Sequence, residues 1–271
     1  MSDVQRIARF RTKVGKTHYG ILRDEKHLTV IDGSVFGGFK LHKKTYRLKE
    51  VKLLHPVDPG DIVAIGYNYV SHGKETGHKE LPEHPIIFLK ASTSVLSPGD
   101  PIVLPHMTPD EVDYEAELAV IIGKSAKNVP ESRALEFVLG YTCGNDVSAR
   151  DAQITLDKQW ARGKSCDTFC PLGPWIVRGI EDPDHLNVQC RLNGEVMQSA
   201  NTSDMIFNVR HLVSYISHNK TLKPGDVIMT GTPDGVGFAR DPKVFLKPGD
   251  TVEVEIENIG TLTNTVRAEH V

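Results

Sequence analysis

The sequence predicts a β-rich α+β fold with few helices and a small N-terminal β lobe. Only three segments of the 271 residues have the apolar spacing of a helix, whereas a Pro-Gly-Asp signature precedes an apolar run four times. Proline presets φ and glycine accepts a positive φ, so each signature predicts a turn that starts a strand. Four such turns favour a core built mostly from non-local strand pairing. The signatures are Pro59-Gly60-Asp61, Pro98-Gly99-Asp100, Pro224-Gly225-Asp226 and Pro248-Gly249-Asp250.

The first 50 residues alternate short apolar pieces with turns, at residues 6–11, 19–23 and 28–31. This alternation predicts a small β-rich lobe over residues 1–55. The expected joint lies at residues 50–56, and residues 56–271 then form one larger domain.

Composition describes an ordinary globular chain, with 39% apolar residues, 25% charged residues and a net charge of −3. Nothing in this balance indicates a nucleic acid or a membrane surface as a partner. No apolar run reaches the ~18 residues that a membrane span needs. The basic start leaves a mitochondrial presequence as an alternative. The apolar pattern that begins at Ile7 and Phe10 looks like the start of the fold, which favours the cytosol.

Three segments have a helical pattern. The first, residues 131–138, is expected to end at Gly140, and the second, residues 148–160, opens with a serine that can act as an N-cap. The third, residues 205–217, has a core-facing stripe. That stripe consists of Ile206, Val209, Leu212, Val213 and Ile216.

The segment 112–123 carries the first chemical signal. It ends in an apolar, β-branched run closed by a glycine, which is typical of a buried strand. Because side chains alternate along a strand, Glu115 and Glu117 are expected on one face, with Cα atoms roughly 6–7 Å apart. Two carboxylates entering a core strand repel each other and resist desolvation, so a hard cation such as Mg²⁺ or Mn²⁺ is expected between them. The alternative is a strand end that faces water.

A third carboxylate, Asp146, is expected where a strand passes into a helix, from which it can reach a cation on a neighbouring strand. Asp151 is expected in the first helical turn, where negative charge is favourable. Arg150 and Gln153 follow Asp146 as donors that can bind a substrate.

The segment 68–82 is polar, rich in glycine and histidine, and lies between apolar runs at 62–65 and 86–89. These features indicate a mobile loop. His72 and Glu75 are three residues apart, so one helical turn would set them on one face. A carboxylate beside an imidazole fixes its tautomer and raises its basicity. The alternative is a solvated surface turn.

Four motifs, in order, resemble the fumarylacetoacetate hydrolase superfamily over residues 56–271. Among its members the chain looks most like the smaller domain-containing proteins that act on acylpyruvates and oxaloacetate. The larger members contribute a further aspartate from an earlier loop, where this chain reads Gly66-Tyr67-Asn68-Tyr69 without an acid. This difference weakens the case for fumarylacetoacetate itself. The motifs start at Asp113, Asn145, Gly163 and Gly231.

The resemblance implies a mixed β-roll or β-sandwich fold and a homodimer. It also implies an Mg²⁺ or Mn²⁺ site and a dyad, on a lid that orders with ligand. The implied cation ligands are Glu115, Glu117 and Asp146; the implied dyad is His72 and Glu75; the implied substrate-side residues are Lys164, Gln153, Gly231 and Thr232.

The implied reaction is hydrolysis of the C–C bond of an acylpyruvate through a metal-stabilised pyruvate enolate. Lys164 would add positive charge, and His72, held by Glu75, would activate water. Oxaloacetate decarboxylation and oxaloacetate keto–enol tautomerisation share the same enolate and remain alternatives. An inactive protein that only binds a metal and a 2-oxo acid is a further alternative, and the presence of both His72 and Glu75 argues against it.

Overall fold

The computed structural model describes residues 4–78, 80–156 and 159–270. Twelve strands form one mixed sheet in the order β4-β3-β2-β1-β14-β12-β11-β17-β6-β7, with β5 paired to β1 and β8 paired to β14. Their bounds are β1 (Gln5–Arg11), β2 (Thr17–Leu22), β3 (His27–Gly33), β4 (Phe39–Arg47), β5 (Lys52–Leu54), β6 (Ile62–Gly66), β7 (Ile86–Lys90), β8 (Val95–Leu96), β11 (Ala116–Ile122), β12 (Val138–Asn145), β14 (Cys170–Arg178) and β17 (Val227–Met229).

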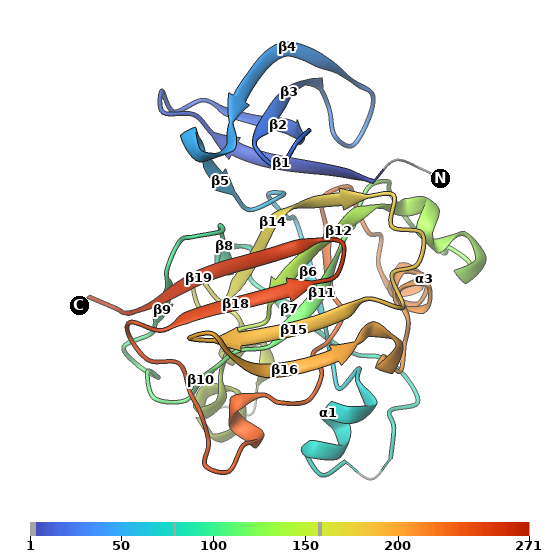
Figure 1. The fold of residues 1–271 in the computed structure, drawn as a ribbon. Helices are drawn as coiled ribbons and strands as arrows, with labels where there is room; N and C mark the ends of the chain where they lie inside the picture. Colours follow the sequence, from blue (N-terminus) through green and yellow to red (C-terminus); the bar gives the residue numbers. More distant parts are fainter. Residues whose placement is uncertain (1–3, 79, 157–158, 271) are drawn as a thin grey trace.

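A second sheet of five strands packs against the middle of the first, in the order β16-β15-β18-β19-β9, and β10 pairs with β13 (Figure 1). The bounds are β9 (Ile102–Leu104), β10 (Val112–Asp113), β13 (Ser148–Ala149), β15 (Asn187–Leu192), β16 (Glu195–Asn201), β18 (Thr251–Ile256) and β19 (Gly260–Ala268). The predicted β-rich fold class with mixed sheets is confirmed.

Helical segments are few and short. The α-helices are α1 (Val70–Glu75), α2 (Trp160–Lys164) and α3 (Val209–Asn219). Single 3₁₀ segments occur at Leu48–Glu50, Ser92–Ser94, Glu131–Phe137, Thr202–Asp204 and Gly237–Ala239, and one π-helical segment at Asp151–Leu156. Among the described residues no helix is long and apolar enough to cross a membrane.

Strand β11 lies at the centre of the core and is buried on both faces. Leu118 and Val120 belong to the main apolar cluster, which the five-stranded sheet and α3 complete. Ala119 and Ile121 point the other way, into a second cluster with β6 and β17. The polar residues at the start of β11 are therefore held in a rigid, water-poor setting.

The four Pro-Gly-Asp turns precede β6, β9, β17 and β18, as predicted. In three of them the glycine has φ of 77–96°, and the aspartate N–H donates to the carbonyl three residues back. The first turn differs, because Gly60 lies outside the left-handed region and the Asp61 N–H donates to Asp226 Oδ1 at 3.0 Å. That bond ties this turn to the turn before β17, which is the parallel neighbour of β6.

The first helix prediction is wrong at its end. A 3₁₀ segment, Glu131–Phe137, is followed directly by β12, so Gly140 lies inside a strand. A Cβ at Gly140 would lie 2.4 Å from the carbonyl oxygen of Val177 in β14. This glycine is therefore explained by close strand packing and does not end a helix.

The second helix prediction, residues 148–160, is wrong for most of its length, and residues 157–158 lie outside the described chain. Ser148 lies in β13 and pairs with Asp113 of β10. Its hydroxyl donates to the Asp146 carbonyl at 2.9 Å, so Ser148 is not an N-cap. A π-helical segment then begins at Asp151, as expected for that acid, and α2 begins only at Trp160.

The third helix prediction is confirmed with a later start. α3 begins after Asn208, whose side chain accepts from the His211 N–H at 2.9 Å. The stripe from Val209 to Ile216 is buried, while Ile206 precedes the helix.

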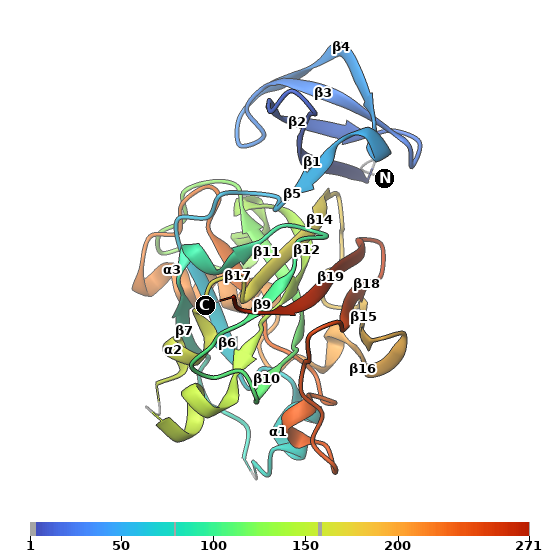
Figure 2. The ribbon, with the colours of Figure 1, turned by 90° about the vertical axis from the view of Figure 1, so that its left-hand side faces the viewer.

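The N-terminal lobe, β1 to β5, lies at the opposite end of the molecule from α1 in both views (Figure 1, Figure 2). Ile7 and Phe10 are fully buried in β1, so this segment is part of the fold, as expected. Strand β1 pairs with β2 on one side and with β14 on the other, which makes the lobe continuous with the large sheet. The division of the chain near residue 55 stays a prediction.

Candidate active site

Three carboxylates meet where β11 begins and β12 ends. Glu117 lies in β11, Asp146 directly follows β12, and Ala116 pairs with Asn145 between them. The predicted strand 112–123 is interrupted before Ala116, because the Glu115 N–H donates to the Asn145 side chain at 3.0 Å. Ligand oxygens of all three buried acids nevertheless lie within 4.8 Å of one another. This all-oxygen donor set fits a hard divalent cation.

Buried cations surround this triad. Lys164 Nζ lies 2.6 Å from Glu115 Oε2 and 2.8 Å from Asp146 Oδ2. Arg150 contacts the other oxygen of Glu115 at 2.7 Å. Lys90, the last residue of β7, donates to Asp146 Oδ1 and to the Lys164 carbonyl.

A fourth buried carboxylate, Asp113, anchors the guanidinium of Arg150. It accepts from Arg150 Nε at 3.0 Å and Nη2 at 2.8 Å, and from the Gly237 and Phe238 N–H groups. The described cluster thus sets four carboxylates against three cations, a formal charge of −1. A divalent cation would change this to +1, which suits an anionic ligand.

The carboxylates differ in their electrostatic surroundings. Although burial raises the pKa of Glu115, the charges of Lys164 and Arg150 outweigh it and hold that pKa well below its ordinary value. Burial, Asp146 and Glu115 together raise the pKa of Glu117 well above its ordinary value. Within the described chain Glu117 has no ion-pair partner, so it is the ligand that most needs a cation.

The loop after β17 closes over Glu117. The Gly231 N–H donates to Glu117 Oε2 at 2.9 Å, so in this structure it holds a cation ligand. Thr232 lines the cavity, where its hydroxyl donates to the Ala116 carbonyl and accepts from Gln198 Nε2 at 2.8 Å. The substrate-binding roles expected of Gly231 and Thr232 stay predictions.

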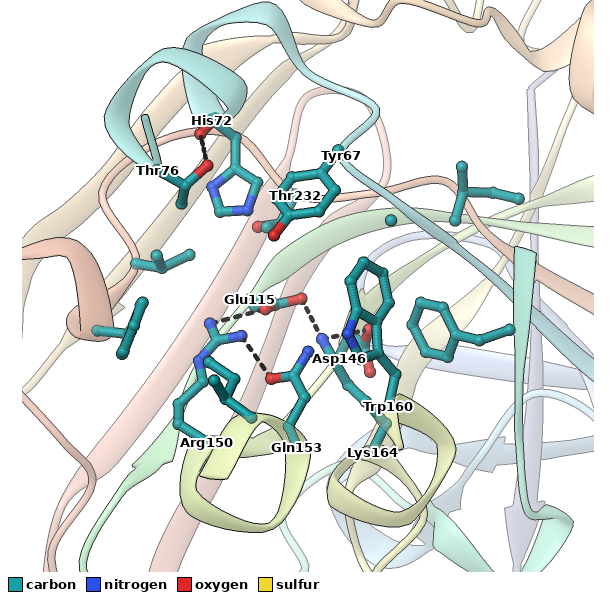
Figure 3. A pocket seen from close by; sticks show the side chains of 16 residues that line it. Tyr67, His72, Thr76, Glu115, Asp146, Arg150, Gln153, Trp160, Lys164 and Thr232 are labelled. Carbon is teal, nitrogen blue, oxygen red and sulfur yellow. Dashed lines mark hydrogen bonds and ion pairs between the residues drawn. The ribbon is translucent and has the colours of Figure 1, made fainter. Parts of the chain in front are cut away.

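His72 and Glu75 meet on the single turn α1, with Nδ1 2.7 Å from Oε1. The second oxygen of Glu75 accepts from the Gly235 N–H at 2.9 Å, which fixes the carboxylate. Since Glu75 holds Nδ1, Nε2 is the nitrogen left to accept a proton. His72 is 7% exposed, which does not fit a solvated turn. Figure 3 shows its ring across the cavity from Arg150, Gln153 and Lys164.

The cavity between them has a volume of about 140 Å³. Gln153 lines it and accepts from Arg150 Nη1 at 3.0 Å. Most of the sequence-predicted site residues line this cavity: His72, Glu115, Asp146, Arg150, Gln153, Lys164 and Thr232. Glu75, Glu117 and Gly231 are not among the lining residues but contact or neighbour them. Their roles in turnover stay predictions.

Sequence reasoning missed several residues of this site, among them Asp113, Lys90, Gln198 and Trp160. Asp113 could have been found, because it continues the alternation of Glu115 and Glu117 along the chain. Lys90 could also have been suspected, since it is a lysine at the end of an apolar run. Gln198 and Trp160 carried no local signal, because only the fold brings them here.

The model of the family "Fumarylacetoacetate (FAA) hydrolase C-terminal" matches residues 61–267, and that of "Rv2993c-like, N-terminal" matches residues 5–56. Human oxaloacetate tautomerase FAHD2A, mitochondrial, is 49% identical over 221 residues, covering 80% of this chain and 70% of that protein. A 5-carboxymethyl-2-hydroxymuconate delta-isomerase structure from Mycobacterium smegmatis has 41% identity and a TM-score of 0.88, covering 97% of this chain and all of its own.

A further solved structure, fumarylacetoacetate hydrolase from the psychrophile Exiguobacterium antarcticum, has 36% identity and a TM-score of 0.87. It covers 98% of this chain and 100% of its own. The family match takes in most of the chain, including every residue of the acidic triad. The protein is therefore an enzyme of the fumarylacetoacetate hydrolase family, of the small domain-containing type.

Proposed function

We propose that this enzyme interconverts the keto and enol forms of oxaloacetate. The observation that carries the proposal is one acid–base dyad, His72 and Glu75, facing the triad across a cavity of about 140 Å³. Most ligand pockets measure about 300–1,000 Å³, so this one suits a four-carbon 2-oxo acid better than a long acylpyruvate. The names of the human tautomerase and the mycobacterial isomerase support the same choice.

Glu115, Glu117 and Asp146 would hold Mg²⁺ or Mn²⁺. When bound, the cation supplies a Lewis acid that stabilises negative charge on the keto oxygen of a 2-oxo acid. Lys164, beside two of the three ligands, adds positive charge for the substrate carboxylate. Arg150 and Gln153 lie on the same wall and orient the acid.

His72 moves the proton. With Nδ1 held by Glu75, Nε2 takes a proton from C3 of the keto form, and the imidazolium is stabilised by the Glu75 carboxylate. The same proton is then delivered to the oxygen on C2, which completes the enol. One C–H bond breaks, one O–H bond forms, and no water is consumed.

The test follows the enol form of oxaloacetate by its ultraviolet absorbance, with purified enzyme and MgCl₂. We expect faster decay of freshly dissolved enol, and loss of this acceleration in the His72→Ala variant. A wild-type enzyme that leaves the decay at the buffer rate would refute the proposal.

Hydrolysis of acylpyruvates, the reaction first expected from the sequence, is the second candidate. The hydrolase name of the Exiguobacterium relative favours it, and a base at His72 could equally activate water. Oxaloacetate decarboxylation would use the same residues. Pyruvate release from acetylpyruvate, fumarylpyruvate and oxaloacetate, measured in parallel, separates the three reactions.

Four properties of the protein stay proposals. We expect a homodimer, so light scattering at micromolar concentration should exclude a 30 kDa species. We expect a small 2-oxo acid as the ligand, with no nucleic-acid or membrane partner, and a cytosolic location with mitochondria as the alternative. The segment 69–82, whose Lys79 lies outside the described residues, is proposed to move and to close over a bound acid. Oxalate should then protect it from proteolysis only when Mg²⁺ is present.

A further inference from the structure

We infer that Trp160 sets the upper size limit of the substrate. This inference rests on the proposed function only because it takes the substrate to be a 2-oxo acid. Trp160 is the first residue of α2 and Lys164 is its last. One short helix therefore carries both the ammonium beside the triad and the ring that bounds the cavity. Figure 3 shows Trp160 between Tyr67 and Lys164, over Asp146.

Three aromatic rings form one wall of the cavity. Trp160 meets Tyr67 edge-on at 5.5 Å and Phe88 edge-on at 5.8 Å between ring centroids. Tyr67 also stacks on His72 at 5.8 Å, and its φ of 49° is uncommon for a bulky residue. Because each ring is held by another, the indole cannot move aside without disturbing the dyad.

Gly66, the last residue of β6, shows that this packing is specific. A Cβ at Gly66 would lie 2.3 Å from Cζ3 and 3.0 Å from Cη2 of Trp160. The φ of Gly66 is outside the left-handed region, so its backbone conformation does not require glycine. The indole requires it, because any side chain at this position would occupy the space of the ring.

The volume of the cavity limits the length of the substrate that can bind. An acid whose 2-oxo end lies at the triad shares a cavity of about 140 Å³, in which Trp160 bounds one side of the space for the groups beyond C3. Replacing the indole with a methyl group would enlarge this space on the Gly66 side. Trp160 thus selects against acids with a long tail, although it is not a catalytic residue.

Calorimetry with MgCl₂ tests the inference without turnover. Oxamate and N-butyloxamate share one head group and differ only in the tail. We expect N-butyloxamate to bind the wild-type enzyme at least about 10-fold more weakly than oxamate, since one misplaced methylene alone can cost that much. In Trp160→Ala this penalty should disappear. A similar penalty in both proteins, or none in the wild type, would overturn the inference.

Leu156→Ala is the matched control, because Leu156 is an exposed apolar residue on the neighbouring π-helical segment and does not line the cavity. Its tail penalty should equal that of the wild type. Because calorimetry measures binding directly, this experiment tests the size limit even if the enzyme shows no tautomerase activity. An unchanged penalty in Trp160→Ala would refute the size limit and leave the proposed reaction untouched.

A double-mutant cycle covers the case in which Trp160→Ala folds poorly. Gly66→Ala alone should weaken oxamate binding at least about 10-fold, because the new Cβ drives the indole into the cavity. In the Trp160→Ala background the same change should cost less than about 2-fold, since the space is then free. An equal loss in both backgrounds, or no loss in the wild type, would contradict the packing argument.

Discussion

The N-terminal lobe and the body of this enzyme use the same charged residue types in opposite ways. Residues 1–55 contain 13 Lys and Arg against 5 Asp and Glu, a net charge of +8, whereas the remaining residues contain 19 against 30, a net charge of −11. The overall −3 conceals this asymmetry. In the lobe most of the cations face water, and in the body the decisive charges are buried.

Strand β4 shows the use of charge in the lobe. It is the edge of the large sheet, and most of its residues are exposed. Its lysines, Lys40, Lys43 and Lys44, are exposed, and lysine at such a position usually keeps an unpaired strand edge from joining another chain. Here charge protects solubility and needs no particular partner.

The body places Lys90, Lys164 and Arg150 among four buried carboxylates. There each of the three cations has a carboxylate partner, because an uncompensated charge in such a setting is very costly. Burial, more than residue type, therefore decides whether a lysine is a solubilising group or part of a reaction site. Four predictions test this difference, beginning with the largest expected effect.

Replacing one cation ligand should have the largest effect. Glu117→Gln should abolish activity, because it removes one of the three ligands of the cation on which the proposed reaction depends. EDTA should inactivate the wild-type enzyme, and Mg²⁺ or Mn²⁺ should restore it. Circular dichroism should show an intact fold, because a core this large does not depend on one cation. Full activity of metal-stripped protein would contradict the assignment.

Removal of the dyad should come next. His72→Ala should reduce turnover by roughly 10²–10⁴-fold, the usual contribution of a general base, while metal affinity stays the same. The His72→Ala/Glu75→Ala double variant should lose little more than the worse single variant, since the pair acts as a unit. Steady-state kinetics with metal titration checks both statements. Additive losses would show that His72 and Glu75 do not act as a unit.

A buried ion pair should contribute more to the free energy of unfolding than an exposed one. Asp113→Asn should lower the free energy of unfolding by about 3–5 kcal/mol, because it removes the charged oxygen that accepts from both Nε and Nη2 of the buried Arg150. Glu25→Gln, which breaks the exposed pair with Arg6 in the lobe, should cost no more than about 1 kcal/mol. Urea denaturation measures both losses in the free energy of unfolding. Equal losses in the two variants would contradict the expected difference between a buried and an exposed ion pair.

The smallest effect is expected on β4. Lys43→Ala removes an exposed charge from the edge strand and should change the free energy of unfolding by no more than about 0.5 kcal/mol. Its kinetics with oxaloacetate should match those of the wild type. A clear loss of turnover would show that the lobe contributes to the site.

Several features could be predicted from the sequence because they depend on local spacing. The four Pro-Gly-Asp turns depend on the φ preferences of two neighbouring residues, and α3 on a repeating apolar stripe. The meeting of His72 with Glu75 follows from one helical turn. Glu115 and Glu117 were expected together from one strand period, and they do meet, although β11 begins only at Ala116. Asp146 was expected as well, because a carboxylate at a strand end can reach a cation on a neighbouring strand, and the family resemblance implied the same residue.

Only the tertiary structure decided the rest, because those features depend on residues far apart in the chain. The helix expected at 148–160 is broken since Ser148 pairs with β10, which outweighs local propensity. Lys90 and Asp113 belong to the site because the fold packs β7 and β10 beside the triad. The fit of Trp160 to Gly66 has no local signal, because a missing Cβ is informative only once the ring that fills its place is known.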